Sequence, residues 1–208
     1  MTDSLLLVHE DEAAHAAQSP AAIAELIAQR ARFADALRAS GQLRDHGRFR
    51  PSREGVRVDR ERVEHGPFAT PLAAYYWVAA DAAQLVASCP RLASDTVEVR
   101  SIMKGSPVPD KDRRPGKIFA FVVIGQEAAM DLIDAETHDS FPADARAGGN
   151  RLQPPRRATF DGPFLESKEI VGGVFFLRMT SLDAAVRWAA ASRFVVHGAL
   201  EIRELWRS

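Results

Sequence analysis

The stretch "FDGPFLESKEIVGGVFF", residues 160–176, decides the expected fold, because "EHGPFATPLAAYYWV" at residues 64–78 repeats its outline. In both stretches Gly-Pro-Phe precedes an apolar run of strand-like composition. A Gly-Pro pair sets the backbone dihedral angles of a turn, and the Phe that follows suits a buried position. The sequence therefore predicts the same corner twice in one chain.

Four further pairs of segments follow the same order in the two halves of the chain. They are residues 5–8 with 119–122, "GRFRP" (47–51) with "NRLQP" (150–154), 75–78 with 174–177, and 97–100 with 200–203. Collinear matches of this kind indicate an internal repeat. We expect copy one at residues 1–103 and copy two at residues 117–208.

Residues 104–116, "KGSPVPDKDRRPG", separate the two copies. Three prolines, two glycines and dense charge do not suit the interior of a helix or strand. This composition favours a semi-rigid linker.

Local sequence signals predict a helix and a hairpin in copy one. Ser19 and Pro20 are a cap and a first helical residue, and Gly41 is a stop signal, so a helix is expected between them. Valines alternate on both sides of the polar residues 59–62, which predicts a hairpin. After each Gly-Pro-Phe we expect a strand (73–79 or 172–179), a short helix and a last strand, with Ser181 capping the second of these helices.

Strand, helix, strand, strand, helix, strand is the split β-α-β pattern of a ferredoxin-like fold. Helices cover one face of such a sheet, and an uncovered second face would be an exposed apolar patch. The second copy supplies a matching sheet. We therefore predict an α+β protein whose two tandem ferredoxin-like (βαββαβ) halves pack sheet to sheet within one chain.

Copy two resembles the YCII-related, or DGPF-domain, family. The resemblance rests on Asp161 to Phe164, the Glu-x-Lys-Glu segment 166–169, Gly172-Gly173 and the helix that starts at Ser181. Copy one is similar more loosely, through "LLLVHEDEAA", "ALRASGQL" and "TVEVRSIM". The resemblance implies a dimeric α/β barrel, here fused in tandem. It also implies distant relatives that include lyases and isomerases of unsaturated organic acids.

The enzymatic relatives implied by this resemblance use a histidine on the first helix and an aspartate in an Asp-Pro pair. Here the corresponding places hold Arg30 and Cys89-Pro90. Neither dyad residue carries over to this sequence.

His65 and Asp161 are the candidate catalytic residues, because each directly precedes a Gly-Pro-Phe. A neutral imidazole is a competent acid or base near pH 7, and a carboxylate becomes one when its pKa rises. If the copies pair with twofold pseudosymmetry, the two residues occupy equivalent positions. The structural alternative is that Asp161 holds the turn and His65 is solvated.

Candidate ligand-binding residues are His9, Tyr75, Trp77, Lys168 and Phe176. Aromatic walls with polar tips suit an apolar pocket between the sheets, although core packing explains the aromatic residues equally well. Lys168 suits an anionic substrate. Residues 9–15 are rich in histidine and acid but lack a recognised ligand spacing, so a solvated acidic turn is favoured and no metal or cofactor is expected.

The composition limits which classes of binding partner are expected. A net charge of -1 gives no reason to expect nucleic acid or a membrane, and a lone cysteine, Cys89, excludes an intrachain disulfide. The first twelve residues lack the pattern of a signal peptide, so a cytoplasmic location is expected. We expect the protein to bind a small molecule between the sheets, with lyase or isomerase chemistry as one possibility. The alternative is a non-catalytic module for ligand binding or assembly. Formation of a homodimer stays open.

Overall fold

The computed structural model describes residues 3–68, 72–79, 82–106, 116–125, 146–152, 159–161 and 170–206. Several predicted features lie outside these ranges: most of the linker, the second Gly-Pro-Phe and Lys168. For Asp161 the structure describes the backbone alone.

The first antiparallel sheet is built from the N-terminal half. Its strands are β1 (Ser4–His9), β2 (Leu43–Arg48), β5 (Leu72–Val78) and β6 (Thr96–Ser106). They lie in the order β2-β5-β1-β6, so the first and third strands are central and the second and fourth flank them. This is the order of a ferredoxin-like sheet.

The second antiparallel sheet comes from the C-terminal half and has the same order. Its strands are β7 (Lys117–Gly125), β8 (Arg146–Leu152), β10 (Ile170–Met179) and β11 (Ala199–Glu204). They lie in the order β8-β10-β7-β11. The predicted α+β class with two ferredoxin-like sheets is confirmed.

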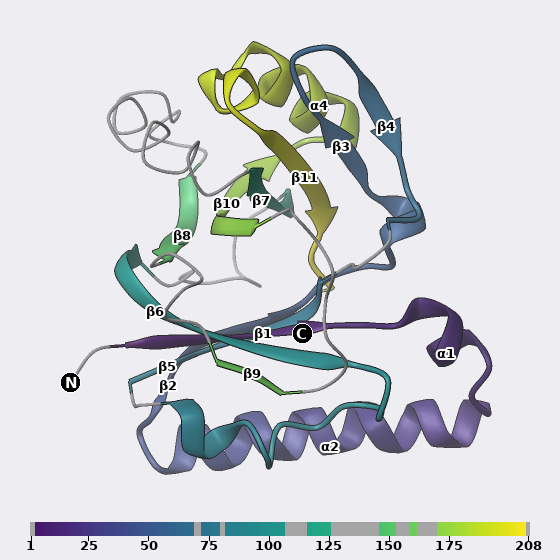
Figure 1. Cartoon of the computed structure of the whole chain (residues 1–208), viewed down its shortest axis with the longest axis vertical. Coiled ribbons are helices and arrows are strands. Elements are labelled where there is room, and N and C mark those ends of the chain that lie inside the picture. The colour runs from purple at the N-terminus through teal and green to yellow at the C-terminus, as the bar shows by residue number, and fades with distance from the viewer. Residues whose placement is uncertain are drawn as a thin grey trace.

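Helices cover the outer faces of the two sheets, as Figure 1 shows for α2 below and α4 above. The long helix α2 (Pro20–Ala39) starts where Ser19 accepts a hydrogen bond from the Ala22 amide, and it ends before Gly41, whose φ is 71°. Ser181 caps α4 (Leu182–Ala191) in the same way. Shorter helical turns are α1 (Glu12–Ala16), η1 (Ser52–Glu54), η2 (Ala82–Leu85) and η4 (Arg193–Val196).

Each half also contributes strands that pair with the sheet of the other half. The predicted hairpin, β3 (Val56–Val58) and β4 (Val63–His65), lies beside β11 in the second sheet. The strand β9 (Thr159–Asp161) lies beside β6 in the first sheet. Both inserts come between the second and third strands of their own half, and this exchange differs from the expected fold, in which each half forms its sheet alone.

The two sheets are joined along both sides. On one side β6 continues past the first sheet and pairs with β8, where Ile102 lies opposite Leu152. On the other side Phe49 and Leu205 form a bridge. Residues 104–106 thus belong to strand β6 and not to a linker, because their backbone pairs with β8.

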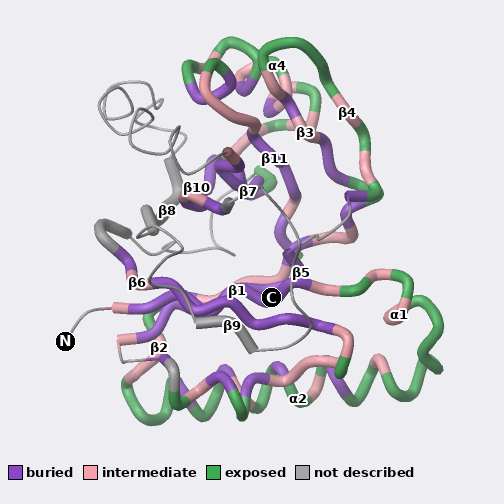
Figure 2. The backbone as a smooth tube through the Cα atoms, viewed as in Figure 1, coloured by how far each residue is buried: buried purple, intermediate pink, exposed green. Residues whose placement is uncertain are grey.

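The described side chains form three apolar layers. Figure 2 shows that buried residues run along the strands. The outer layers lie under α2 and under α4. The middle layer lies between the sheets and contains Tyr75, Trp77 and Phe176, with the Tyr75 and Phe176 rings stacked at 5.2 Å. The predicted packing of sheet against sheet is confirmed.

The strand pairing corrects one detail of the predicted repeat. Leu7 lies opposite Glu98 and Val122 lies opposite Glu201, so Leu5 corresponds to Ala120 rather than to Phe119. A shift of one residue exchanges the two faces of a strand. With the corrected register, residues that face the middle layer in one sheet do so in the other.

Two buried ion pairs lie at equivalent positions, one in each sheet. In β6 the Arg100 guanidinium donates to Glu98 at 2.7 Å, and in β11 the Arg203 guanidinium donates to Glu201 at 3.0 Å. All four residues are buried. They are paired with the inward-facing β1 and β7 residues, so both ion pairs belong to the layer between the sheets.

Replacing Phe176 by Ala tests this layer. The change removes a ring that contacts Tyr75 across the two sheets, and we expect a loss of about 3–5 kcal/mol in the free energy of unfolding. Urea titration measures the loss. Val196→Ala is the control, because Val196 is 49% exposed and its loss should stay below about 0.5 kcal/mol. A loss below about 1 kcal/mol for Phe176→Ala would mean that the layer does not hold the sheets together.

Candidate functional site

The aromatic candidates between the sheets are fully engaged in the core. The Tyr75 hydroxyl donates to Asp45 at 3.0 Å, and the Trp77 indole N–H donates to Asp3 at 2.8 Å. Burial, together with the Asp45 carboxylate, raises the pKa of Tyr75 well above its usual value. Their rings pack with Phe176, so this part of the space between the sheets is filled by side chains.

His9 lies in the same layer, next to the ion pair of the first sheet. Its Nε2 is 3.0 Å from Glu98, while the buried Nδ1 has no hydrogen-bond partner among the residues that the structure describes. Burial acts to raise the pKa of Glu98, but hydrogen bonds and charge from His9 and Arg100 lower it overall. His9, Glu98 and Arg100 therefore form a buried triad in which the charges of the Glu98 carboxylate and the Arg100 guanidinium compensate each other.

The second sheet replaces this histidine by an arginine from the exchanged hairpin. Glu201 accepts from Arg203 and, at 3.2 Å, from Arg57 of β3. The residue of β7 that corresponds to His9 is Ile124. The two halves therefore use different third members for the same buried pair.

The two predicted catalytic positions are not equivalent. His65 is exposed on β4, at the outer edge of the second sheet and opposite Val56. Asp161 lies on β9 opposite Val97, directly beside β6. The predicted twofold relation between the two residues is wrong, because His65 lies one strand further from the fourth strand of its sheet than Asp161 does.

The first Gly-Pro-Phe forms a tight corner. A Cβ at Gly66 would lie 1.9 Å from the Ser52 carbonyl oxygen, so a side chain does not fit there. The Phe68 amide donates to the Ser52 hydroxyl at 3.1 Å, and the Arg57 guanidinium lies 4.9 Å from the Phe68 ring centroid. This copy of the motif holds a turn against the core.

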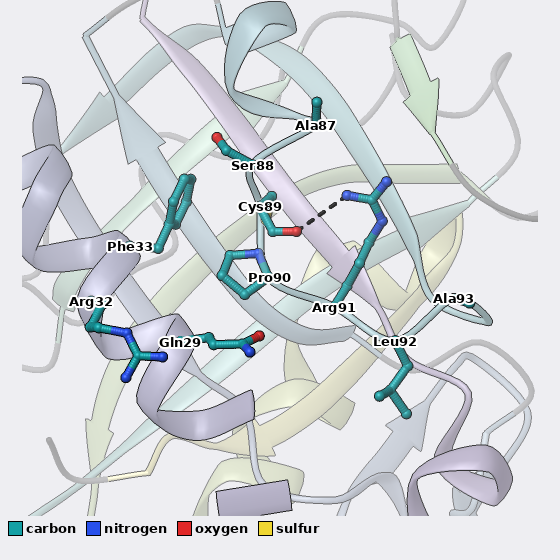
Figure 3. Close-up of a pocket in the computed structure, with 10 residues that line it drawn as sticks. All are labelled: Gln29, Arg32, Phe33, Ala87, Ser88, Cys89, Pro90, Arg91, Leu92 and Ala93. Atoms are coloured by element: carbon teal, nitrogen blue, oxygen red, sulfur yellow. Dashed lines mark hydrogen bonds between the residues drawn. The ribbon is translucent and has the colours of Figure 1, made fainter. Parts of the chain in front are cut away.

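A pocket lies outside the first sheet, between α2 and the segment 87–93 that follows η2 (Figure 3). Its volume is about 690 Å³. From α2 come Gln29, Arg32 and Phe33, and the other wall is the continuous segment 87–93. This pocket differs from the predicted ligand site, which lies between the sheets.

Three buried or half-buried residues hold this wall in place. The Arg91 guanidinium donates to the Val86 carbonyl at 2.8 Å, and Arg30 of α2 donates to the Pro90 carbonyl at 3.3 Å. The Asp95 carboxylate accepts from the Leu92 amide at 2.9 Å. The pocket wall is therefore fastened to the helix and to the start of β6.

A charged cluster lies beneath this wall. His15 Nε2 is 3.0 Å from Asp95, and His15 Nδ1 is 3.5 Å from Glu10. Arg30 lies 3.5 Å from Glu10 and 3.7 Å from Asp95. Burial raises the pKa of Glu10, whereas for Asp95 burial is outweighed by hydrogen bonds from His15 and backbone amides, and its pKa is lowered.

This cluster contradicts the expected solvated acidic turn, because the side chains of His15 and Glu10 are only 11% and 19% exposed. One feature of the sequence indicates that this charged cluster is buried. Leu26, Arg30, Ala34 and Leu37 form the buried stripe of α2, and a charged residue within an apolar stripe requires buried partners.

The titratable groups of the pocket lining are few. Burial raises the pKa of the Cys89 thiol to about 11, so the thiol is protonated near neutral pH. Within the described part of the lining there is no histidine or carboxylate. The arrangement suits binding of an anion with an apolar body.

Among the described residues, no group of three His, Cys, Asp or Glu side chains is placed to hold a metal ion. None of the described helices has the length and apolar character needed to cross a membrane.

Glu98→Gln tests the buried triad between the sheets. At pH 7 the change should cost about 1.5–3 kcal/mol, since the hydrogen bonds of His9 and Arg100 then end on a neutral group. The pKa of Glu98 is lowered on folding, so its contribution is complete above the usual value of 4.5 and is lost as the pH falls through the folded value. Urea unfolding from pH 7 down to pH 3 should show the gap between variant and parent narrowing below pH 4.5. A gap that is constant with pH would contradict this account.

Comparison with known proteins adds three findings. No curated protein matches the chain. A crystal structure described provisionally as a chlorite dismutase is similar over 99% of this chain and 94% of its own, with 10% sequence identity and a TM-score of 0.46. Residues 122–208, from within β7 to the end of the chain, match the YCII-related domain.

Proposed function

We propose that this protein binds a small, partly apolar organic anion in the pocket between α2 and residues 87–93. The observation that carries the proposal is the lining, which combines apolar surface with two guanidinium groups and includes no described carboxylate. The volume of about 690 Å³ falls in the usual range for small-molecule sites. The filled layer between the sheets is why we place the ligand here.

Each part of such a ligand has a counterpart in the pocket. Phe33, Pro90 and Leu92 offer apolar contact to the body of the molecule. Arg32 offers a guanidinium fork to its anionic group. Its present partner, Glu25, is exposed, and exposed ion pairs contribute little, so a ligand displaces Glu25 at small cost.

Binding without catalysis is the leading proposal, because the thiol of Cys89 is protonated and no other proton-transfer group is described in the lining. Lyase or isomerase chemistry is the second candidate. It is favoured by the His15–Asp95 pair, since Asp95 also accepts the amide of Leu92 in the pocket wall. The catalytic roles of His65 and Asp161 belong to this second candidate.

Arg32→Gln tests the ligand site. A panel of aryl and alkyl carboxylates is screened by thermal shift, and binding of the hits is measured by calorimetry. We expect the change to weaken binding about tenfold, as for loss of one charge-assisted hydrogen bond. Arg38→Gln is the matched control, because Arg38 is also exposed on α2 and paired with a carboxylate of the same helix.

Two results would decide against these proposals. Equal affinities for the Arg32 and Arg38 variants would exclude the pocket as the anion site. Turnover of a bound carboxylate that disappears in His15→Gln, while its affinity is kept, would replace simple binding by proton-transfer chemistry.

We further propose that the chain consists of two fused YCII-like copies, residues 1–103 and 117–208. Support comes from the shared strand order and from the equivalent buried pairs Glu98–Arg100 and Glu201–Arg203. Each half on its own exposes one apolar sheet face. Residues 1–106 and 116–208, produced together as separate chains, should therefore co-purify as one complex and precipitate when produced alone. Two soluble, folded and independent fragments would contradict the proposal.

A further inference from the structure

Gln29 presents a hydrogen-bond acceptor in the lining of the pocket between α2 and residues 87–93. Its Nε2 donates to Glu25 Oε1 at 3.3 Å along the exposed side of α2. An ionised carboxylate only accepts hydrogen bonds, so this contact fixes which end of the Gln29 amide is the nitrogen. Among the described residues, none donates a hydrogen bond to Gln29 Oε1. The amide oxygen therefore remains available to a ligand.

Arg32 lies directly beside this amide. Its Nη2 donates at 2.6 Å to Glu25 Oε1, the same atom that accepts from Gln29. Residues three apart on a helix lie on one face, and the shared acceptor atom holds the two head groups next to each other. Figure 3 shows both side chains extending from α2 at the pocket. A guanidinium group and an amide oxygen are thus within reach of one small molecule.

The acceptors of the opposite wall differ from this amide oxygen. The carbonyl oxygens of Cys89 and Pro90 already accept from arginine side chains, at 3.2 and 3.3 Å. The Ser88 hydroxyl donates to the Leu85 carbonyl at 3.0 Å, and its lone pairs make it a competing acceptor. Gln29 is the acceptor that lies next to the Arg32 guanidinium.

We propose that the ligand of this pocket carries a hydrogen-bond donor on the carbon next to its carboxylate, as a 2-hydroxy acid or an N-acylated amino acid does. The carboxylate binds the Arg32 guanidinium, and the neighbouring O–H or N–H donates to Gln29 Oε1. The apolar remainder packs against Phe33 and Pro90. The pocket is the one proposed above, so this class of ligand rests on the proposed function.

Glu25 keeps a partner when such a ligand binds. Hydrogen bonds from Arg32 and then from Gln29 lower the pKa of Glu25, so the carboxylate is ionised near pH 7. When Arg32 turns to the ligand, Gln29 Nε2 still donates to Glu25. The Gln29 amide is therefore held with its oxygen available while the ligand is bound.

The test compares acids that differ in this one donor. Calorimetry at pH 7 measures the affinity of the full chain for 3-phenylpropionate and for both enantiomers of 3-phenyllactate and of N-acetylphenylalanine. We expect at least one donor-carrying acid to bind about fivefold more tightly than 3-phenylpropionate, as for one added hydrogen bond. A gain for 3-phenyllactate assigns the pocket to hydroxy acids, and a gain for N-acetylphenylalanine alone assigns it to acylated amino acids.

Gln29→Met should remove this gain, because methionine keeps the length and helix propensity of the side chain but lacks the amide oxygen. Gln18→Met is the matched control and should keep the gain, since Gln18 is also exposed and lies outside the pocket lining. A gain kept in Gln29→Met, or no gain in the parent, would overturn the proposed ligand class.

The outcomes separate this ligand class from the proposed function. If 3-phenylpropionate binds, weakens in Arg32→Gln and is not improved upon by any donor-carrying acid, the ligand class is wrong and the anion site stands. If none of these acids binds, the ligand class is again wrong, whereas the anion site falls only when the wider panel of carboxylates fails as well.

Discussion

The structure depends on burying the second face of each sheet against the other sheet. Helices α2 and α4 cover the outer faces, and the inner faces carry aromatic and branched residues that water would otherwise contact. The same layer contains the ion pairs Glu98–Arg100 and Glu201–Arg203, which are compatible with burial because each carboxylate has two cationic or imidazole donors. Both halves must be present for either inner face to be covered.

This constraint is the reason that we propose a ligand site outside the two sheets. Side chains such as Tyr75 and Phe176 fill the described space between the sheets, and the Tyr75 hydroxyl donates a hydrogen bond to Asp45. The outer face of the first sheet is different, because a pocket lies there between α2 and residues 87–93, and Arg30 of α2 pairs with Glu10 nearby. The pocket beside Arg32 lies on this outer side of the sheet.

Local signals predicted the local structure. The cap at Ser19, the stop at Gly41, the turn at 59–62 and the cap at Ser181 all lie where the sequence placed them. Partners distant in sequence were not predictable from pattern alone. His9 and Glu98 are 89 positions apart in the sequence, and His15 and Asp95 are 80 positions apart. The exchange of β9 and the hairpin was also missed, because edge pairing is set by backbone groups that every residue shares.

The most direct test of the account is whether the two sheets unfold as one unit. Trp77 reports on the first sheet, and Trp188 packs against Phe121 and Phe175 of the second. Two variants, one that retains Trp77 alone and one that retains Trp188 alone, with phenylalanine at the other tryptophan positions, should be unfolded in urea while fluorescence is followed. The account predicts coincident single transitions for the two reporters. Separate midpoints, or a plateau at which one sheet is folded and the other is not, would contradict it.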